Sequence, residues 1–91
     1  MFEFEYDVSK SISNFAKHNI DFEKSKELWA DADAIEIPAI TVDEPRFLII
    51  GKIEGVHWSA VITYRINRVR IISVRRSRIE EIKIYESSRI R

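Results

Sequence analysis

The stretch RFLIIGKIEGVHWSAVITYRINRVRIISVRR, residues 46–76, decides the fold of this 91-residue chain. Apolar and β-branched residues dominate it, which is typical of β-strands. Two short interruptions, Glu54-Gly55 and Asn67-Arg68, have the composition of tight turns. The stretch therefore predicts three long antiparallel strands: residues 46–53, 56–66 and 69–75.

Before these strands, the sequence predicts a short strand and a helix. Apolar and acidic residues alternate over residues 2–6, the period of a half-buried strand. Asp7 can cap a helix that runs to residue 18, and Asn19 is a suitable left-handed stop. This helix carries an apolar stripe that we expect to face the core: Val8, Ile12, Phe15 and Ala16.

A second helix, a fourth strand and a last helix complete the pattern. Asp21 can cap the second helix, which forms a helical hairpin with the first. Its expected apolar stripe is Phe22, Ser25, Leu28 and Trp29. Residues 34–37 predict a strand that Pro38 stops, and Ser77-x-x-Glu80 is a capping-box signature for the last helix.

This order of elements predicts one α+β domain over residues 1–91. An N-terminal strand and a two-helix hairpin are expected to pack on an antiparallel sheet, followed by a C-terminal helix. We expect the helices on one face of the sheet, which leaves the other face open to solvent or a ligand.

Alternation along the strands predicts which side chains share a face. In the strand over 56–66, the core-facing set is Val56, Trp58, Ala60, Ile62, Tyr64 and Ile66. The more polar set, expected on the open face, is His57, Ser59, Val61, Thr63 and Arg65. In the last strand, Ile72 and Val74 are expected to be buried, while Ile71, Ser73 and Arg75 form the other set.

The composition excludes several classes of protein. The chain has no cysteine, so a disulfide scaffold and a thiolate zinc site are excluded. His18 and His57 are too few for a histidine metal site without carboxylates, and we expect no metal and no cofactor. No apolar run approaches the roughly 20 residues of a membrane span, so a soluble, cytoplasmic protein without a membrane partner is expected.

The charges are divided unevenly along the chain. Lys and Arg number 15, as do Asp and Glu, but residues 1–45 carry −7 and residues 46–91 carry +7. Such asymmetry indicates an anion-binding surface or an oppositely charged partner. The alternative is that the two halves neutralise each other within one fold.

Six arginines fall within 14 residues of the basic half: Arg65, Arg68, Arg70, Arg75, Arg76 and Arg78. Guanidinium groups bind phosphate bidentately, so an open sheet face with arginines and aromatic residues would suit single-stranded RNA. The alternative is that these charges only keep edge strands from aggregating.

Three sequence blocks together resemble the BrnT family, the toxin half of a bacterial or archaeal type II toxin–antitoxin pair. The blocks are Asp7-x-x-Lys10-x-x-x-Asn14-x-x-Lys17-His18-x-Ile20-x-Phe22-Glu23, then Arg46-Phe47-x-x-Ile50-Gly51, then Arg70-Ile71-Ile72-Ser73-x-Arg75-Arg76-Ser77 with Glu81 and Tyr85 beyond it. They span nearly the whole chain. Asn19 stands where the family usually has Gly, and Ser77 where it usually has Ala.

The resemblance implies a RelE-like fold and a metal-independent endoribonuclease, a hydrolase that cleaves RNA and inhibits translation. It also implies a BrnA-like antitoxin with a ribbon-helix-helix domain, a toxin–antitoxin heterotetramer, and contact with operator DNA only through the antitoxin. The alternative is a non-enzymatic or inactive homologue that acts as a protein-interaction and operon co-repressor module.

Metal-free RNA cleavage needs an acid, a base and positive charge at the scissile phosphate. Within the family blocks, His18 is the titratable group with an ordinary pKa near neutrality, so it is the candidate acid or base. A capping or packing role for His18 is equally open. The candidate phosphate clamps are Arg46, Arg65 and Arg75, and the candidate RNA-binding residues are Lys10, Lys17, Arg70 and Arg76. Trp58 and Tyr64 either stack on bases or, as we favour, pack in the core.

Overall fold

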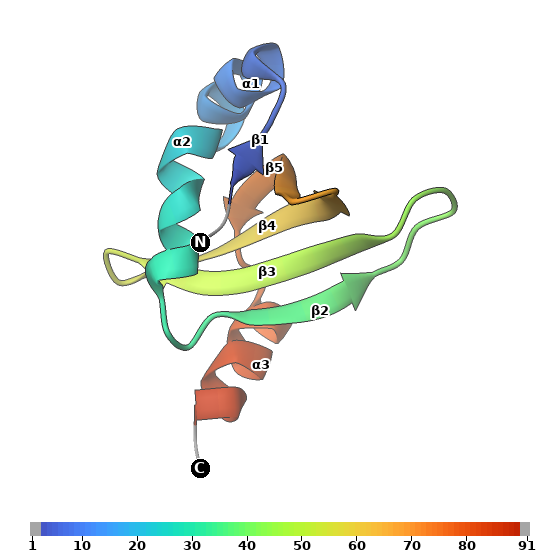
Figure 1. The fold of residues 1–91 in the computed structure, drawn as a ribbon. Helices are drawn as coiled ribbons and strands as arrows, with labels where there is room; N and C mark the ends of the chain where they lie inside the picture. Colours follow the sequence, from blue (N-terminus) through green and yellow to red (C-terminus); the bar gives the residue numbers. More distant parts are fainter. Residues whose placement is uncertain (1–2, 90–91) are drawn as a thin grey trace.

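The computed structural model describes residues 3–89, which form a five-stranded sheet in the spatial order β1-β5-β4-β3-β2, with helices on both sides (Figure 1). In chain order the elements are β1 (Phe4–Glu5), α1 (Val8–His18), α2 (Phe22–Ser25), the 3-10 helix η1 (Lys26–Ala30), β2 (Ile35–Ala39), β3 (Arg46–Ile53), β4 (Val56–Arg65), β5 (Arg68–Arg76) and α3 (Ile79–Arg89). The predicted α+β class and order of elements are confirmed. Phe2, expected in the first strand, lies outside the described residues.

Strands β3, β4 and β5 form the predicted antiparallel meander, with Phe47 opposite Ile62 and Val61 opposite Ser73. Glu54 and Gly55 have φ angles of 51° and 81°, the left-handed conformation that a two-residue hairpin turn requires. At the edges, β2 pairs antiparallel with β3, while β1 pairs in parallel with β5. The sheet is therefore antiparallel except at its β1 edge.

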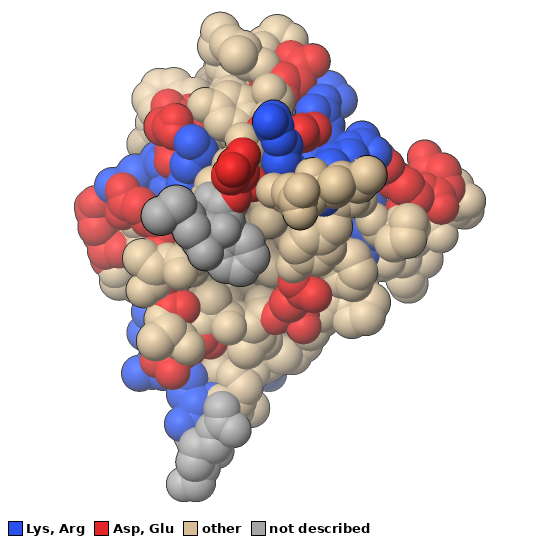
Figure 2. All heavy atoms as spheres, in the orientation of Figure 1, with Lys and Arg blue, Asp and Glu red and all other residues tan. Residues whose placement is uncertain are grey.

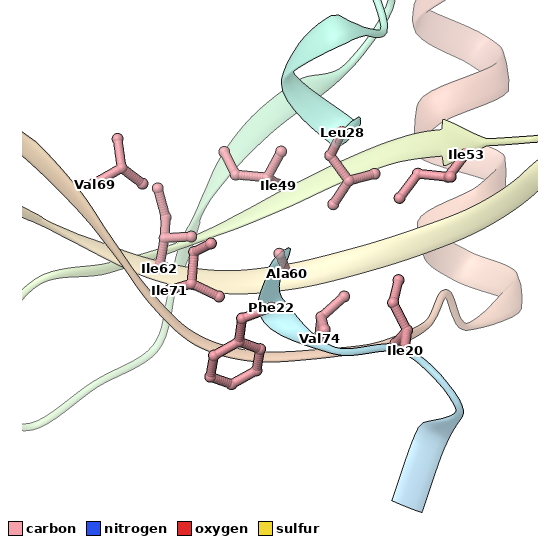
Figure 3. Close-up of a cluster of buried hydrophobic side chains, with 10 residues drawn as sticks. All are labelled: Ile20, Phe22, Leu28, Ile49, Ile53, Ala60, Ile62, Val69, Ile71 and Val74. Atoms are coloured by element: carbon pink, nitrogen blue, oxygen red, sulfur yellow. The ribbon is translucent and has the colours of Figure 1, made fainter. Parts of the chain in front are cut away.

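The main core lies between the sheet and the segment that contains α2 and η1. Its buried members are Ile20, Phe22, Leu28, Ile49, Ile53, Ala60, Ile62, Val69, Ile71 and Val74 (Figure 3). The predicted stripe of the second helix is confirmed, because Phe22, Ser25 and Leu28 are buried and Trp29 packs against the core.

Helix α3 packs on the opposite face of the sheet from α1 and α2 (Figure 1). Tyr85, which is 1% exposed, contacts Leu48 and Ile50 there. The expectation that all helices share one face was therefore wrong. The reason lies in β3, where consecutive residues are apolar, so that both faces of the strand need cover.

The inward stripe expected for α1 was also wrong, although its caps are as predicted. Asp7 accepts hydrogen bonds from the backbone N–H groups of Ser9 and Lys10, and Asn19 ends the helix with a φ of 61°. The buried residues of α1 are Ser11 and Asn14, not apolar ones. The apolar residues are exposed instead: Val8 by 67%, Ile12 by 67% and Phe15 by 53%.

Helix α1 docks through its polar residues because Asn14 replaces a neighbouring strand at the edge of β5. Its side-chain amide donates to the carbonyls of Val74 and Ile20 and accepts from the N–H of Val74. Ser11 accepts from the N–H of Phe22. These bonds satisfy buried backbone groups that an apolar side chain would leave unpaired.

A β-bulge opposite Val61 and Ile62 changes the alternation in β5. One extra residue in β5 places Ile71 and Val74 in the core and leaves Ile72 half-buried. The expected burial of Val74 is confirmed, whereas the exchange of Ile72 for Ile71 is a correction.

Several predicted boundaries also differ. The turn between β4 and β5 is Ile66-Asn67 and not Asn67-Arg68, because Arg65 pairs with Arg68. β2 continues through Pro38, which pairs with Phe47, because an edge strand tolerates a residue without an N–H group. The cap of α3 is shifted by one residue: the Glu81 carboxylate accepts from the N–H of Arg78, while the Ser77 hydroxyl bonds Ser59. The Ser77-x-x-Glu80 capping box was therefore wrong in register.

Candidate nucleic-acid interface

Four of the predicted arginines lie on the face of the sheet that α3 covers in part, here called the α3 face. Strand alternation places Arg46 on the same side as Leu48, which contacts Tyr85 of α3. By the same rule Arg65 shares the side of Val61. On β5, the α3 face carries the other two, Arg70 and Arg75.

Arg75 is held by Glu81 of α3 through two parallel hydrogen bonds, each of 2.8 Å. Glu81 also accepts bonds from the Ser59 hydroxyl and the Arg78 N–H. The Arg75 guanidinium, aided by these donors, lowers the pKa of Glu81 from 4.5 to about 2 despite burial. Arg75 therefore carries a carboxylate partner rather than a free positive charge.

The turn between β4 and β5 carries the paired-arginine end, which we define as Arg65, Arg68 and Arg70 with Glu3, Glu5 and Glu44. Arg65 lies 2.7 Å from Glu44 and Arg70 lies 2.9 Å from Glu5. Arg68 lies 4.0 Å from both Glu3 and Glu5. Here acidic residues from the first half of the chain pair with arginines from the second. Figure 2 shows basic (blue) and acidic (red) residues lying side by side on the visible face of the molecule.

Arg65 and Arg75 are far apart along the sheet. Arg65 lies opposite Arg68 and Arg75 lies opposite Ser59, six residues earlier on β4. At about 3.3 Å per residue, this separation is about 20 Å. The predicted clamps therefore do not surround one phosphate.

Arg46 differs from the other arginines of this face. Its Nε atom is buried and has no hydrogen-bond partner among the described residues. No carboxylate within residues 3–89 forms an ion pair with it. A buried donor without a partner costs free energy, which a bound acceptor would recover.

A second basic region lies at the edge of β5, beneath α1. This α1–β5 hollow has a volume of about 390 Å³ and is lined by Lys10, Ser13, Asn14, Lys17, His18, Phe22, Ile72 and Ser73. None of these lining residues is acidic. Neither lysine forms an ion pair with a described carboxylate. The hollow therefore combines hydroxyl groups and an imidazole with two lysines that lack a described ion-pair partner.

The spacing of the α1 residues explains how the hollow forms. Lys10 and Lys17 are seven residues apart, two turns of helix, so they lie on one flank. Asn14 holds this flank against β5, and the bulge brings Ile72 and Ser73 to its border. In the sequence, Ser11 and Asn14 are polar residues at helical spacing, and this spacing could have indicated that α1 packs through a polar side.

The remaining predicted residues lie elsewhere. Arg76 stacks over the Trp58 ring on the α2 side, with 5.6 Å between the guanidinium carbon and the ring centroid. Trp58 packs against the main core, as favoured. The core position favoured for Tyr64 was wrong, because its side chain is 44% exposed. It contacts Phe47 and donates to Glu36, and its partial burial followed by this carboxylate raises its pKa to about 12.

A polar cluster around α3 was not predicted. His57 Nε2 lies 2.7 Å from Glu86, which also lies 3.4 Å from Lys52. Tyr85 donates to Asp31, and burial of Tyr85 is the main cause of its raised pKa. His57 stands in the polar set of its strand, and only that position could have indicated a partner on α3. The cluster fixes α3 to the sheet.

Comparison with known families identifies the class of protein. The family model described as "Ribonuclease toxin, BrnT, of type II toxin-antitoxin system" matches residues 6–81. The chain therefore belongs to the BrnT family of ribonuclease toxins. Membership implies an RNA target and an antitoxin partner. A search of curated proteins found no match.

Two further properties concern the part of the chain that the structure describes. No three His, Cys, Asp or Glu side chains in residues 3–89 are grouped so that they could share a metal ion. Over the same residues, no helix has the length and apolar character that a membrane span requires.

Proposed function

We propose that this chain is a metal-independent endoribonuclease that cleaves RNA in the cytoplasm and inhibits translation, and that a BrnA-like antitoxin neutralises it within a heterotetramer. The α1–β5 hollow carries this proposal. It unites His18, Lys10 and Lys17, which were predicted as catalytic or RNA-binding residues, in a place without carboxylates. Phosphate oxygens fit such a place because neither lysine forms an ion pair with a described carboxylate.

In the proposed reaction, one phosphodiester of RNA lies in the hollow. A base removes the proton of the 2′-hydroxyl, whose oxygen attacks the adjacent phosphorus. The bond between phosphorus and the 5′-oxygen breaks, an acid donates a proton to that oxygen, and a 2′,3′-cyclic phosphate remains. His18 acts as base or acid, while Lys10 and Lys17 stabilise the charge that develops on the phosphate.

The arginines of the α3 face extend the proposed RNA path. Ser73 borders the hollow and stands on β5 between Arg70 and Arg75. Arg46 offers an unpaired donor, while Arg65, Arg70 and Arg75 must exchange a carboxylate for a phosphate. Arg76 binds RNA only from the other face of the sheet, where it stacks on Trp58.

The decisive experiment is cleavage of a defined RNA in EDTA, with mapped ends and with and without ribosomes. Wild-type protein is expected to leave cyclic phosphate ends. His18→Ala is expected to reduce the rate by at least about 10²-fold, the usual scale for an acid–base group. His57→Ala is the matched control, because His57 lies against Glu86 and outside the hollow. Equal rates for wild type and His18→Ala would remove His18 from the chemistry.

A second candidate function is a non-enzymatic interaction and co-repressor module. The observation in its favour is that Arg65 and Arg75 are paired with carboxylates. Induction of the gene in cells separates the two functions. Growth arrest with cut RNA supports the enzyme, whereas normal growth with intact RNA supports the module.

A further inference from the structure

Helix α1 exposes a surface that its own fold does not use. The apolar residues Val8, Ile12 and Phe15 follow one another at helical spacing and are half or more exposed. Ile12 and Phe15 also line a groove of about 280 Å³ with Ser11 and Asp21. Exposed apolar surface of this kind marks interaction sites.

The other exposed residues of α1 are also arranged in rows along the helix. Ser9, Ser13 and Ala16 form an exposed row of small side chains beside the apolar stripe. On the far side of this row lie Lys10 and Lys17, which border the α1–β5 hollow. A small-residue row between an apolar flank and a basic flank allows the close approach of another helix.

The charges define the chemistry of that helix. Between its caps, α1 carries only basic charged residues. The carboxylates at its ends are already engaged, because Asp7 caps α1 and Asp21 caps α2. The complementary partner is a helix with apolar residues on one side and acidic residues on the other.

We propose that α1 is the docking site for an amphipathic, acidic helix of the antitoxin, which inserts apolar side chains along Val8, Ile12 and Phe15 and pairs acidic side chains with Lys10 and Lys17. This inference rests on the proposed antitoxin partner and adds its place and chemistry. Because Lys10 and Lys17 line the α1–β5 hollow, the docked helix excludes RNA from it. Neutralisation then follows from competition for one helix.

A second copy of the chain is the less suitable occupant. The exposed isoleucines Ile79 and Ile84 of its α3 could meet the stripe of α1, beside the acidic Glu80. Such a contact joins different surfaces, so it closes only where a two-fold axis or a ring lets every copy make it, and it otherwise propagates into open assemblies. An antitoxin helix covers the stripe of α1 in a one-to-one contact that does not propagate.

The test is titration of the antitoxin encoded with this chain onto purified toxin, measured by calorimetry. Ile12→Glu is expected to weaken binding by at least about 30-fold, the scale of an interface hot spot. Lys17→Glu is expected to weaken it by about tenfold and to reduce its salt dependence. Ile40→Glu is the matched control, because Ile40 is fully exposed on the loop between β2 and β3.

RNA cleavage by Ile12→Glu alone is expected to equal that of wild type and to resist inhibition by the antitoxin. Circular dichroism melting must show that the variant is folded. Wild-type affinity in Ile12→Glu overturns the docking site but not the partner. Failure of the wild-type chain to bind the antitoxin overturns both. Sedimentation provides the remaining outcome: oligomers of the chain alone that Ile12→Glu dissolves would assign the stripe to a second copy.

Discussion

The α1–β5 hollow and the paired-arginine end are both basic in sequence, but they differ in what surrounds their charges. In the hollow, Lys10 and Lys17 have no carboxylate among the lining residues. At the paired-arginine end, Arg65 and Arg70 already bind Glu44 and Glu5. A phosphate can enter the hollow directly, whereas at the other end it must displace a carboxylate.

The difference shows that arginine density is a poor measure of an anion-binding surface. The partners of Arg65 and Arg70 come from the first half of the chain, and Glu5 is 65 residues away from Arg70. Folding therefore pairs four of the six arginines of the densest basic segment with carboxylates, while Lys10 and Lys17 of the acidic half form no ion pair with a described carboxylate. Net charge by segment predicted the opposite ranking.

The largest expected effect is on the hollow itself, through Asn14. Asn14→Ala removes three hydrogen bonds and leaves the N–H and C=O of Val74 and the carbonyl of Ile20 without this partner. We expect the free energy of unfolding to fall by about 3–4 kcal/mol, since unsatisfied buried groups cost about 1–3 kcal/mol each and some regain water. Urea denaturation measures this change.

Ser13→Ala is the control for Asn14→Ala, because Ser13 lines the same hollow but is exposed. Its expected change is within about 0.5 kcal/mol, as for other surface substitutions. Equal stability of Asn14→Ala and Ser13→Ala would show that α1 does not depend on the amide bridge.

The second prediction concerns the pair of Arg75 and Glu81, the most buried ion pair of the α3 face. Because the folded pKa of Glu81 is about 2 and its ordinary value is 4.5, its stabilisation is fully present above about pH 4.5. It is lost as the pH falls toward 2. Glu81→Gln is therefore expected to cost about 2–3 kcal/mol at pH 7 and almost nothing near pH 2. Denaturation curves over this pH range measure the difference.

Glu80→Gln is the control for Glu81→Gln, since Glu80 is the exposed neighbour on α3. Its expected change is within about 0.5 kcal/mol at either pH. A constant difference between wild type and Glu81→Gln from pH 7 to pH 2 would contradict the depressed pKa.

Local features of the fold were predictable, whereas contacts between distant segments were not. The caps Asp7 and Asn19 and the turn at Gly55 act within a few residues, and each was found as predicted. The face of α1 depends on Asn14 bonding Val74, 60 residues away, which no helical period reveals. The position of α3 depends in the same way on Tyr85 meeting β3.

The same distinction holds for the candidate site: the grouping of nearby residues was predicted, and the ion pairs between distant residues were not. The family blocks predicted Lys10, Lys17 and His18 together, and the structure lines one hollow with all three. The blocks did not predict that Arg65 and Arg75 would be paired with carboxylates, since Glu44 and Glu81 become partners only after folding. The roles of these residues in RNA cleavage stay predictions.

The third prediction concerns RNA affinity. Lys10→Ala combined with Lys17→Ala is expected to weaken RNA binding by about 30-fold near 0.1 M salt. The slope of log affinity against log salt is expected to decrease by about 1.4, the single-strand value for two phosphate contacts. Fluorescence anisotropy with a short RNA over a salt series measures both quantities.

Lys83→Ala is the control for the lysines, because Lys83 is exposed on α3 and forms no ion pair with a described carboxylate. It removes the same charge from another part of the surface. An equal loss of affinity with Lys83→Ala would mean that RNA responds to net charge and not to the hollow.

The smallest effect is expected at the paired-arginine end, where the ion pairs are exposed. Glu44→Gln removes the nearer partner of Arg65 and leaves Glu5 at 4.0 Å; because the Arg65 side chain is 45% exposed, the pair with Glu44 is worth at most about 1 kcal/mol. RNA affinity is expected to rise two- to fivefold, because Arg65 keeps only the more distant Glu5 and can bind phosphate more readily. Asp43→Asn removes the same charge from a neighbouring exposed residue that pairs with no described cation, and it is expected to change affinity less. If the two variants gain equally, Arg65 makes no specific contact with RNA, and the proposed RNA path ends before the turn between β4 and β5.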